Sequence, residues 1–297
     1  SNGINPWFGD IDPYLMAGSC IDEAIRNIVA VGASVEKTAL LDNFCWGNPD
    51  KLIKLGELVK TVKGCHDFAV DFEVGYISGK DSFYNEYTKD KLHISIPGTL
   101  LISAVSIMND ARKRISMDLK QEENLLYIVG ETFNELGASH YFANNGFTGN
   151  TAPRVDAKKA LYSYKSLNEA MGSGTKIQDK IVRSCHDLSE GGLGVSIAEM
   201  CFAGMKGAQI DLTNLPYGEK IEREDFALFS ESNSRLLVEV NKNKKREFEL
   251  IMKGNSFAQI GTVTNEKKLK IKGFNGKDIV NEDISALKKS WKKTLNW

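Results

Sequence analysis

Glu23 and Asn27 combine side-chain types and a spacing that could hold a metal ion. They lie four residues apart in the segment IDEAIRN, and this spacing places both side chains on one side of a helix, roughly opposite an apolar face. A carboxylate and an amide oxygen arranged in this way could share a hard cation such as magnesium. The spacing alone, however, favours a solvated helix surface over a metal site.

The segment SCHDLSEGGLGVSIAEM offers a phosphate site at the start of a helix. An expected strand ends at His186 and Asp187, and Gly191 and Gly192 then lead into an apolar helix. Such a helix N-terminus favours phosphate, Asp187 could hold a metal that bridges phosphates, and Ser189 could donate a hydrogen bond. Alternatively, Ser189 caps the helix. His186 is interpreted as a structural histidine, because nothing places a nucleophile beside it.

Two further polar segments accompany expected strands. In LLDNFCWGNPD a short strand ends at Asp42, and polar residues at strand ends often face a ligand crevice in open α/β sheets. In ISGKDSFYNEY, Gly79 lets backbone amides approach a phosphate, while Lys80 and Ser82 add charge and hydrogen bonds. The spacing of a Walker A loop is missing. Each segment is also compatible with an ordinary polar turn.

Arg235 stands between the polar run FSESNS and the apolar run LLVEV. Its guanidinium could clamp a phosphate as a fork of hydrogen-bond donors. It could as easily close a surface ion pair, so the sequence leaves both roles open.

Helices and strands that alternate along the chain must position these residues. Helical periodicity is clear over residues 17–30 and, through Leu52, Leu55 and Val59, over residues 51–72. Tyr76 and Ile77 are expected to lead into a glycine-containing loop, and residues 137–150 to form a loop rich in Gly and Asn. Further helices are expected over 156–171, 192–203, 244–252 and 284–295, and strands over 39–44, 99–107, 125–129, 181–185, 207–212, 235–240, 257–263 and 268–271. The alternation predicts an α/β or α+β fold with helices on the face of a sheet.

A change of composition divides the chain into two expected domains. Between Met108 and Asn124 the sequence becomes charged, and an apolar strand pattern begins again at Leu125. We therefore expect an N-terminal domain of residues 1–112 and a C-terminal domain of residues 113–297.

Composition limits the partners and the compartment. The 297 residues carry a formal net charge of -1, so nucleic acid is not expected as the main partner. No apolar stretch approaches the roughly 20 residues that span a bilayer, and no signal peptide opens the chain. The five cysteines are scattered, without a CxxC pair, and are expected to be reduced thiols and not zinc ligands. These features predict a cytoplasmic protein without a membrane partner.

The motifs are weak one by one, but their order is specific. GDIDPYLMAGSCIDEAIRNIVAVGA, LLDNFCWGNPD, SGKDSFYNEY, IPGTLLISAVSI, CHDLSEGGLGVSIAEM and FSESNSRLLVEV follow one another between about Gly3 and Trp291. In this order they closely resemble the second half of the formylglycinamide ribonucleotide amidotransferase family. That family belongs to a superfamily with aminoimidazole ribonucleotide synthetase, selenophosphate synthetase and thiamine-phosphate kinase.

The resemblance implies a fold and a reaction. Members combine an N-terminal α/β domain, whose strands pair with a partner copy, and a C-terminal α/β domain. The full family enzyme resembles two such units fused as a pseudo-dimer, and this chain resembles the second unit. In the family, ATP phosphorylates the amide oxygen of the substrate, and ammonia from a glutaminase subunit or domain then displaces phosphate to give an amidine.

The resemblance also implies roles for individual residues. Asp42, Gly79 and Ser82 match positions that bind ATP or substrate at the catalytic site. Lys80 stands where part of the family has an asparagine that binds magnesium, and a charged lysine has no lone pair with which to do so. An auxiliary site for ATP or ADP is implied by a second set, made of metal ligands and nucleotide contacts: Glu23, Asn27, Asp187, Ser189, Gly191 and Gly192.

No catalytic residue is expected in this chain, because the family's catalytic histidine and its neighbouring ATP-binding lysine lie in the first half. The preferred interpretation is half of a ligase that is inactive alone and needs an N-terminal half and a glutaminase. An alternative is a nucleotide-binding assembly module without turnover. A stand-alone homodimeric synthetase or kinase of the superfamily is a third reading. Because unpaired sheet edges seek partners, the isolated chain is expected to form a homodimer.

Overall fold

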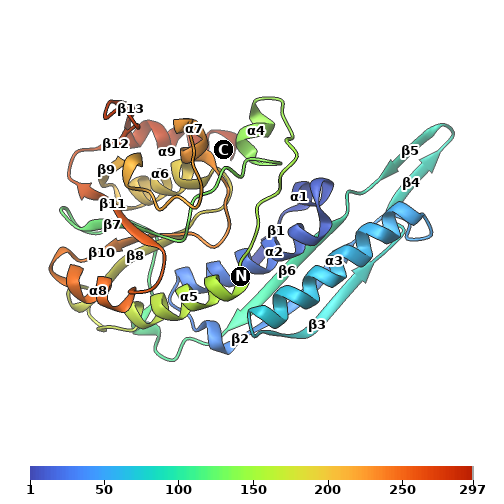
Figure 1. Ribbon diagram of the computed structural model, residues 1–297, viewed down its shortest axis with the longest axis horizontal. Helices are drawn as coiled ribbons and strands as arrows, with labels where there is room; N and C mark the ends of the chain where they lie inside the picture. The colour runs from blue at the N-terminus through green and yellow to red at the C-terminus, as the bar shows by residue number, and fades with distance from the viewer. Residues whose placement is uncertain (296–297) are drawn as a thin grey trace.

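The computed structural model describes residues 1–295, which form two units that lie side by side (Figure 1). The first unit is a small sheet with helices on one side, and it includes the long β-hairpin at one end of the molecule. Its elements are β1 (Asn2–Ile4), α1 (Pro6–Ile11), α2 (Pro13–Ala30), β2 (Thr38–Cys45), α3 (Leu52–Asp71), β3 (Gly75–Ser82), β4 (Glu86–Lys89), β5 (Leu92–Ser95) and β6 (Thr99–Ser106).

Local sequence explains where the central helix of this unit begins. Asp12 caps α2 by accepting hydrogen bonds from the amides of Tyr14 and Leu15, at 2.9 and 3.3 Å, and Pro13 occupies the first helical position. Nearly every residue of α2 is buried, including Ile21 and Ile25. The helix is therefore enclosed by protein and is not a surface helix.

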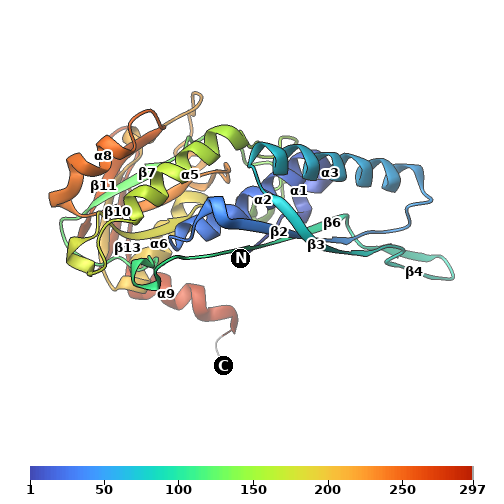
Figure 2. The same cartoon turned by 90° about the horizontal axis from the view of Figure 1, so that it is seen from below.

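The first sheet has the strand order β1–β6–β2–β3, with β2 and β3 parallel and the other neighbours antiparallel. Leu100, Ile102 and Ala104 of β6 are buried on the side of α2 and α3, as alternation along a strand requires. Leu101, Ser103 and Val105 face the other side. In Figure 2 α2 and α3 lie on one side of this sheet, and no described element covers the opposite side.

The second unit is a larger sheet between two layers of helices. Its strand order is β13–β12–β9–β11–β7–β10–β8, and only the β9–β12 pair is parallel. Its elements are β7 (Leu125–Val129), α4 (His140–Asn144), α5 (Ala157–Met171), β8 (Val182–Asp187), α6 (Gly192–Gly204), β9 (Gly207–Asp211), α7 (Glu224–Phe229), β10 (Leu236–Val240), α8 (Lys245–Ile251), β11 (Phe257–Thr264), β12 (Lys268–Lys272), β13 (Asp278–Asp283) and α9 (Ile284–Lys292).

Alternate side chains of the central strands feed two cores. Tyr127 and Val129 of β7 pack in one core with residues of α5 and α8, whereas Leu126 and Ile128 pack in the other with residues of α6. The first core continues through α5 into α2, so the two units share one apolar interior. The predicted α/β architecture, with helices covering a sheet, is confirmed.

Two structural expectations were wrong in detail. Tyr76 and Ile77 do not lead into a loop, because β3 continues through Gly79 and Lys80 to Ser82 as the exposed edge of the sheet. The expected loop of residues 137–150 contains the short helix α4, which Ser139 caps by accepting from the amide of Phe142 at 3.2 Å. A single turn of helix in a Gly- and Asn-rich stretch has no periodic pattern that would reveal it.

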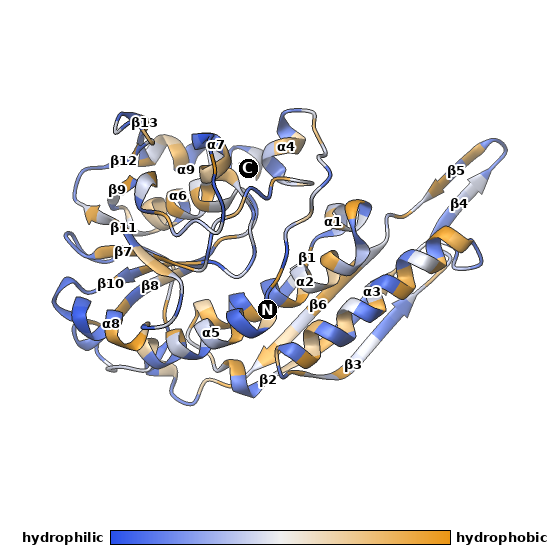
Figure 3. Cartoon of the chain, in the orientation of Figure 1, coloured by the Kyte–Doolittle hydropathy of each residue, from blue (hydrophilic) through white to orange (hydrophobic). Residues whose placement is uncertain are grey.

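The apolar periodicity of α3 does not mark its buried face. Leu52, Leu55 and Val59 point to solvent, and the buried residues, such as Cys65 and Phe68, lie farther along the helix. Figure 3 shows the resulting apolar segments on this helix. The packing against α2 is close, because a β-carbon at Gly64 would lie 2.7 Å from the backbone oxygen of Tyr14.

Two observations bear on the environment of the protein. None of the helices in residues 1–295 is long and apolar enough to cross a membrane. The five cysteines are free thiols, and four of them are buried. The proposed division of the chain at residues 112 and 113 falls in the segment that connects the two sheets, and it stays a prediction.

Candidate functional site: a polar cluster between α2 and the β8–α6 loop

The structure brings α2 and the β8–α6 loop together. Arg26 lies one turn from Asp22 on α2, forms an ion pair with it, and donates from Nη2 to Oγ of Ser189 at 3.0 Å. Arg26 is buried, and its charge lies close enough to Glu23 and Asp187 to influence them. The segment of Glu23 and Asn27 and the segment of Asp187 and Ser189 are therefore neighbours in the fold, although Arg26 and Ser189 are 163 positions apart in the chain.

Arg26 was missed in the sequence because its role depends on tertiary contacts. The signal that could have found it is the four-residue spacing of Asp22 and Arg26 in a helix with a long apolar pattern. A charged pair in such a helix must be satisfied by contacts from elsewhere in the chain.

Glu23 is almost fully buried, with 9% of its surface exposed, so a solvated helix surface is ruled out at this residue. Its Oε2 accepts hydrogen bonds from the amide of Ile4 at 3.1 Å and from Nδ2 of Asn5 at 2.7 Å. Burial raises the pKa of Glu23 to about 7, against the opposing influence of Arg26 and with further repulsion from Glu190. The hydrogen bonds and the charge of Arg26 thus offset only part of the cost of burying the charged carboxylate.

Asp187 lies at the end of β8, and its carboxylate has two side-chain hydrogen-bond partners. Its Oδ1 is 3.0 Å from Nδ1 of His186, and its Oδ2 accepts a hydrogen bond from Ser189. Burial alone would raise the pKa of Asp187, but the hydrogen bond to His186 and the charge of Arg26 hold it well below its usual range. Asp187 therefore stays ionised in the folded protein.

His186 is a satisfied histidine, as interpreted from the sequence. Its Nε2 is 2.8 Å from Oε2 of Glu199, in addition to the contact with Asp187. Burial alone would lower the pKa of His186, but the two carboxylates outweigh this effect and raise the pKa to about 9.

Two glycines shape the start of α6. Gly191 and Gly192 have φ angles of +79° and +56°, and a β-carbon on Gly192 would lie 2.2 Å from the backbone oxygen of Ser230. Gly191 is the N-cap, so the alternative role of Ser189 as the cap is wrong. The amide of Gly191 donates to Glu231 at 2.8 Å, and that of Gly192 to the oxygen of Ser189 at 2.9 Å. A phosphate that binds these two amides would have to replace their present acceptors, Glu231 and the oxygen of Ser189.

Glu231 is a second residue that the sequence did not single out for a role. Its Oε1 accepts from the amides of Gly191 at 2.8 Å and His140 at 2.9 Å. It thereby ties the start of α6 to the start of α4. The indole of Trp7 packs against His140, with 5.0 Å between ring centroids, and connects α1 to the start of α4.

The donor set fits magnesium in its chemistry. Glu23, Asn27 and Asp187 offer carboxylate and amide oxygens, which hard cations prefer, and the buried charge of Glu23 is incompletely compensated. Within residues 1–295 no three His, Cys, Asp or Glu side chains approach one another closely enough to form a metal site by themselves. A metal at this site would therefore need phosphate and water ligands in addition to the two carboxylates. The metal assignment stays a prediction.

The catalytic-site residues predicted from the sequence lie on β2 and β3. Asp42 and Gly79 are register partners, and a β-carbon at Gly79 would lie 2.0 Å from Oδ1 of Asp42. Both face the helix side of the sheet. Partial burial and repulsion from Asp81 raise the pKa of Asp42.

Lys80 and Ser82 face the opposite, uncovered side of the same sheet. They are two residues apart on β3, so alternation places them together, and Nζ of Lys80 donates to Oγ of Ser82. Register pairs them with Asn43 and Cys45 of β2. The structure thus divides the four predicted residues between the two faces of the sheet.

Arg235 serves neither of the two roles considered from the sequence. It is fully buried and donates to the backbone oxygens of Ser232 and Ser230, at 2.9 and 2.6 Å, and to Thr132 Oγ1 at 3.0 Å. Burial lowers its pKa to about 10. A phosphate clamp or a surface ion pair needs an accessible guanidinium, and this one instead holds together the loop that contains Glu231.

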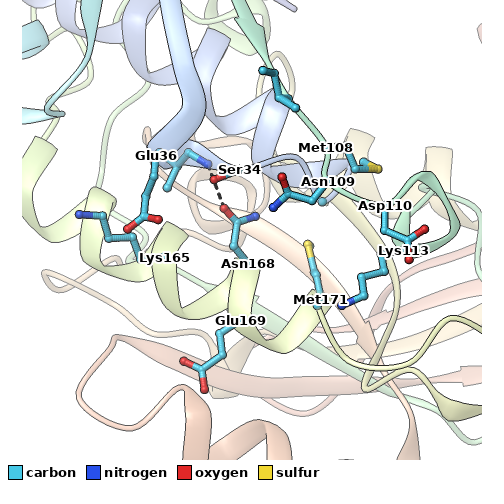
Figure 4. A pocket seen from close by; sticks show the side chains of 14 residues that line it. Ser34, Glu36, Met108, Asn109, Asp110, Lys113, Lys165, Asn168, Glu169 and Met171 are labelled. Carbon is cyan, nitrogen blue, oxygen red and sulfur yellow. Dashed lines mark hydrogen bonds between the residues drawn. The ribbon is translucent and has the colours of Figure 1, made fainter.

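The cavity in Figure 4, of about 340 Å³, is lined by none of the residues predicted for the catalytic site or for the auxiliary nucleotide site. It is lined by the α2–β2 loop, the segment between the units and α5. Asn168 accepts from the amide of Val35 at 3.1 Å and donates to the oxygen of Ala33 at 3.0 Å, and Lys165 pairs with Glu73. Asn168 and Lys165 are therefore already used in contacts within the chain.

Comparisons with known proteins agree with this fold. The family described as AIR synthase related protein, N-terminal domain, matches residues 2–100. The family described as AIR synthase related protein, C-terminal domain, matches residues 121–273. The chain belongs to the AIR synthase related family, with both of its domains.

Within this family the similarity extends over nearly the whole chain. Phosphoribosylformylglycinamidine synthase subunit PurL of Methanocaldococcus jannaschii is 33% identical over 291 residues, which is 97% of this chain and 38% of that protein. PurL of Thermococcus sibiricus is 31% identical over 284 residues, 96% of this chain and 37% of that protein. The chain therefore spans less than two fifths of the length of these relatives.

Solved structures share the fold at low sequence identity. Thermotoga maritima PurL complexed with FGAR superimposes with a TM-score of 0.76 and 18% identity, covering 96% of this chain and 45% of that protein. Hydrogenase maturation protein HypE in complex with ATP superimposes with a TM-score of 0.65 and 12% identity, covering 95% of this chain and 84% of HypE.

Proposed function

We propose that this chain is the second synthetase unit of a phosphoribosylformylglycinamidine synthase. The observation that carries the proposal is the similarity to PurL proteins along nearly the whole chain, in both domains. The reaction converts formylglycinamide ribonucleotide to the amidine. The terminal phosphoryl group of ATP moves to the amide oxygen of the substrate. Ammonia then attacks the carbon of that amide, and phosphate leaves with the oxygen.

In this proposal the chain contributes binding groups and no catalytic residue. Asp42, the backbone of Gly79 and Ser82 contact ATP or the substrate at one catalytic site beside the exposed edge strand β3. Lys80, beside Ser82, adds positive charge where phosphates gather and leaves metal binding to other residues. The catalytic histidine and the remaining ATP contacts come from a first half of the synthetase.

The cluster between α2 and the β8–α6 loop is proposed as an auxiliary site for Mg–ADP or Mg–ATP. Glu23, Asn27 and Asp187 hold the metal, which neutralises the phosphates and the buried carboxylates. Ser189, with the start of α6 at Gly191 and Gly192, contacts the phosphates. This site stabilises the fold without turnover. It corresponds to the alternative hypothesis of a nucleotide-binding assembly module.

Reconstitution tests the ligase assignment. The purified chain, given formylglycinamide ribonucleotide, Mg–ATP and ammonium, is expected to form no amidine, because the family's catalytic histidine lies in the first half of the synthetase. Adding the first half of a related PurL should produce turnover, which Ser82→Ala lowers and Ser95→Ala, on the β4–β5 hairpin, does not. Turnover by the chain alone would contradict the proposal, and so would a reconstituted enzyme indifferent to Ser82.

The uncovered side of the first sheet is proposed as the surface that meets the partner unit. Leu101 and Val105 of β6 lie on this side, and β3 is an exposed edge strand. An exposed edge beside an uncovered apolar face favours pairing with another copy. Glutamine-derived ammonia is proposed to come from a separate glutaminase subunit or domain, and the free thiols fit a cytoplasmic location.

Without a first half, the chain is expected to form a homodimer through this side of the sheet. Val105 is 51% exposed, and Val105→Lys would place a charge in the interface and shift the protein to a monomer. Val59→Lys is the matched control, since Val59 is 60% exposed but lies on α3. Analytical ultracentrifugation at micromolar concentration measures the change. A wild-type monomer, or equal effects of both variants, would refute this interface.

A further inference from the structure

His186 is held at both ring nitrogens by carboxylates. Nδ1 lies 3.0 Å from Oδ1 of Asp187, and Nε2 lies 2.8 Å from Oε2 of Glu199 on α6. A ring with a partner on each nitrogen has a fixed orientation, because any rotation breaks at least one of the two bonds. His186 therefore constrains where the carboxylate of Asp187 can point.

Glu199 is itself fixed by the C-terminal helix. Nε1 of Trp291 on α9 donates to Oε1 of Glu199 at 2.9 Å, so each oxygen of this carboxylate has one partner. The indole also packs against Phe202 of α6, with 5.7 Å between ring centroids. Trp291 thus connects α9 to the predicted metal site through two further side chains.

The remaining contacts of Asp187 complete its orientation. Ser189 donates to Oδ2, and Oγ of Ser196 donates to the backbone oxygen of Asp187 at 2.9 Å. Oδ1 has His186 as its neighbour, so each carboxylate oxygen is fixed by one protein group and retains further lone pairs. Such a carboxylate is oriented for a metal before the metal arrives.

We propose that Trp291, Glu199 and His186 form an orienting relay that fixes the carboxylate of Asp187 for the metal of the auxiliary nucleotide site. His186 is a positioning residue in this relay and touches neither nucleotide nor substrate. The inference rests on the proposed auxiliary site, and it adds the three residues that make the site selective for the metal-bound nucleotide. Removing such partners of a ligand typically weakens metal binding by about 10- to 100-fold.

Calorimetric titration of the full chain with ADP, once with Mg²⁺ and once with EDTA, tests the relay. His186→Asn should weaken Mg–ADP binding about 10-fold, since an amide cannot bridge both carboxylates, and should leave metal-free ADP binding unchanged. Trp291→Phe keeps an aromatic ring against Phe202 but loses the N–H donor, so it should change binding in the same direction and less. Asp187→Ala should abolish the difference between the two titrations.

His93→Asn is the matched control, because His93 lies on β5 and contacts Lys51 and Thr88, with no contact to the site. Titration of Mn²⁺ alone, followed by electron paramagnetic resonance, should show the same order of affinities without nucleotide. Both readouts separate metal positioning from a general structural role, which would weaken ADP binding with and without metal.

The outcomes distinguish the relay from the site on which it rests. If Asp187→Ala loses Mg–ADP binding while His186→Asn and Trp291→Phe bind like the wild type, the relay is overturned and the site stands. If the wild type shows no binding that depends on Asp187, the site fails and the relay with it. Equal weakening by His186→Asn in Mg²⁺ and in EDTA also overturns the relay, and Trp291→Phe decides the matter if His186→Asn does not fold.

Discussion

Asp22→Ala is expected to lower the free energy of unfolding by about 3–5 kcal/mol, because it leaves the Arg26 guanidinium buried without its counter-charge. Asp22 is fully buried. It accepts hydrogen bonds from Oη of Tyr164 at 2.7 Å and from the amide and hydroxyl of Ser234, both at 2.8 Å. These partners come from α5 and from the loop before β10, so one carboxylate joins the first unit to the second.

Urea unfolding measures this effect. Asp71→Asn is the control, because Asp71 forms an exposed ion pair with Lys158 at 3.3 Å and should cost less than about 1 kcal/mol. Adding Arg26→Met to Asp22→Ala should recover part of the loss, since the unpaired charge disappears. A loss below about 1 kcal/mol for Asp22→Ala, or no recovery in the double variant, would contradict this account of the contact between the units.

The second large effect concerns Glu23. In metal-free protein, Glu23→Gln is expected to raise the stability at pH 8 by up to about 3 kcal/mol and to change it little near pH 4.5. Burial raises the pKa of Glu23 from 4.5 to about 7, so the folded chain keeps this proton at pH values where the unfolded chain has lost it. The stability that Glu23 contributes is complete below pH 4.5 and is lost as the pH rises to 7.

Unfolding in urea with EDTA, at several pH values from 4.5 to 8, measures the difference between the two proteins. Glu222→Gln is the control, because Glu222 is an exposed carboxylate on the surface. If the site binds magnesium, adding Mg²⁺ at pH 8 should stabilise the wild type and not Glu23→Gln. A difference that does not depend on pH would show that the amide acts through packing and not through the buried charge.

Local sequence determined much of the secondary structure, for reasons visible in individual elements. The α2 pattern has a capping aspartate, a proline at the first position and sustained apolar periodicity, and these signals act locally. The α3 pattern was equally clear, yet Leu52 and Val59 turned out to be exposed. Periodicity shows that a helix has an apolar side, but not whether this chain or a partner covers it.

The candidate residues were found from the order of motifs, and their neighbours were not. The spacing of Glu23 and Asn27 was ambiguous by itself. The structure removes the ambiguity about solvation at Glu23, because Ile4 and Asn5 close over its carboxylate. Arg235 shows the opposite case: its position between polar and apolar runs indicated a charge for ligands or the surface, whereas its three acceptors lie in the interior.

The sequence by itself determined the α/β class, most helices and strands, and the family, because these depend on local patterns and on the order of motifs. Only the tertiary structure decided that Arg26 joins α2 to Ser189, that Asp22 joins the two units, and that Lys80 and Ser82 lie on a different face from Asp42. Each of these depends on groups far apart in the chain. Their contacts are set by sheet register and helix packing, which no local pattern specifies.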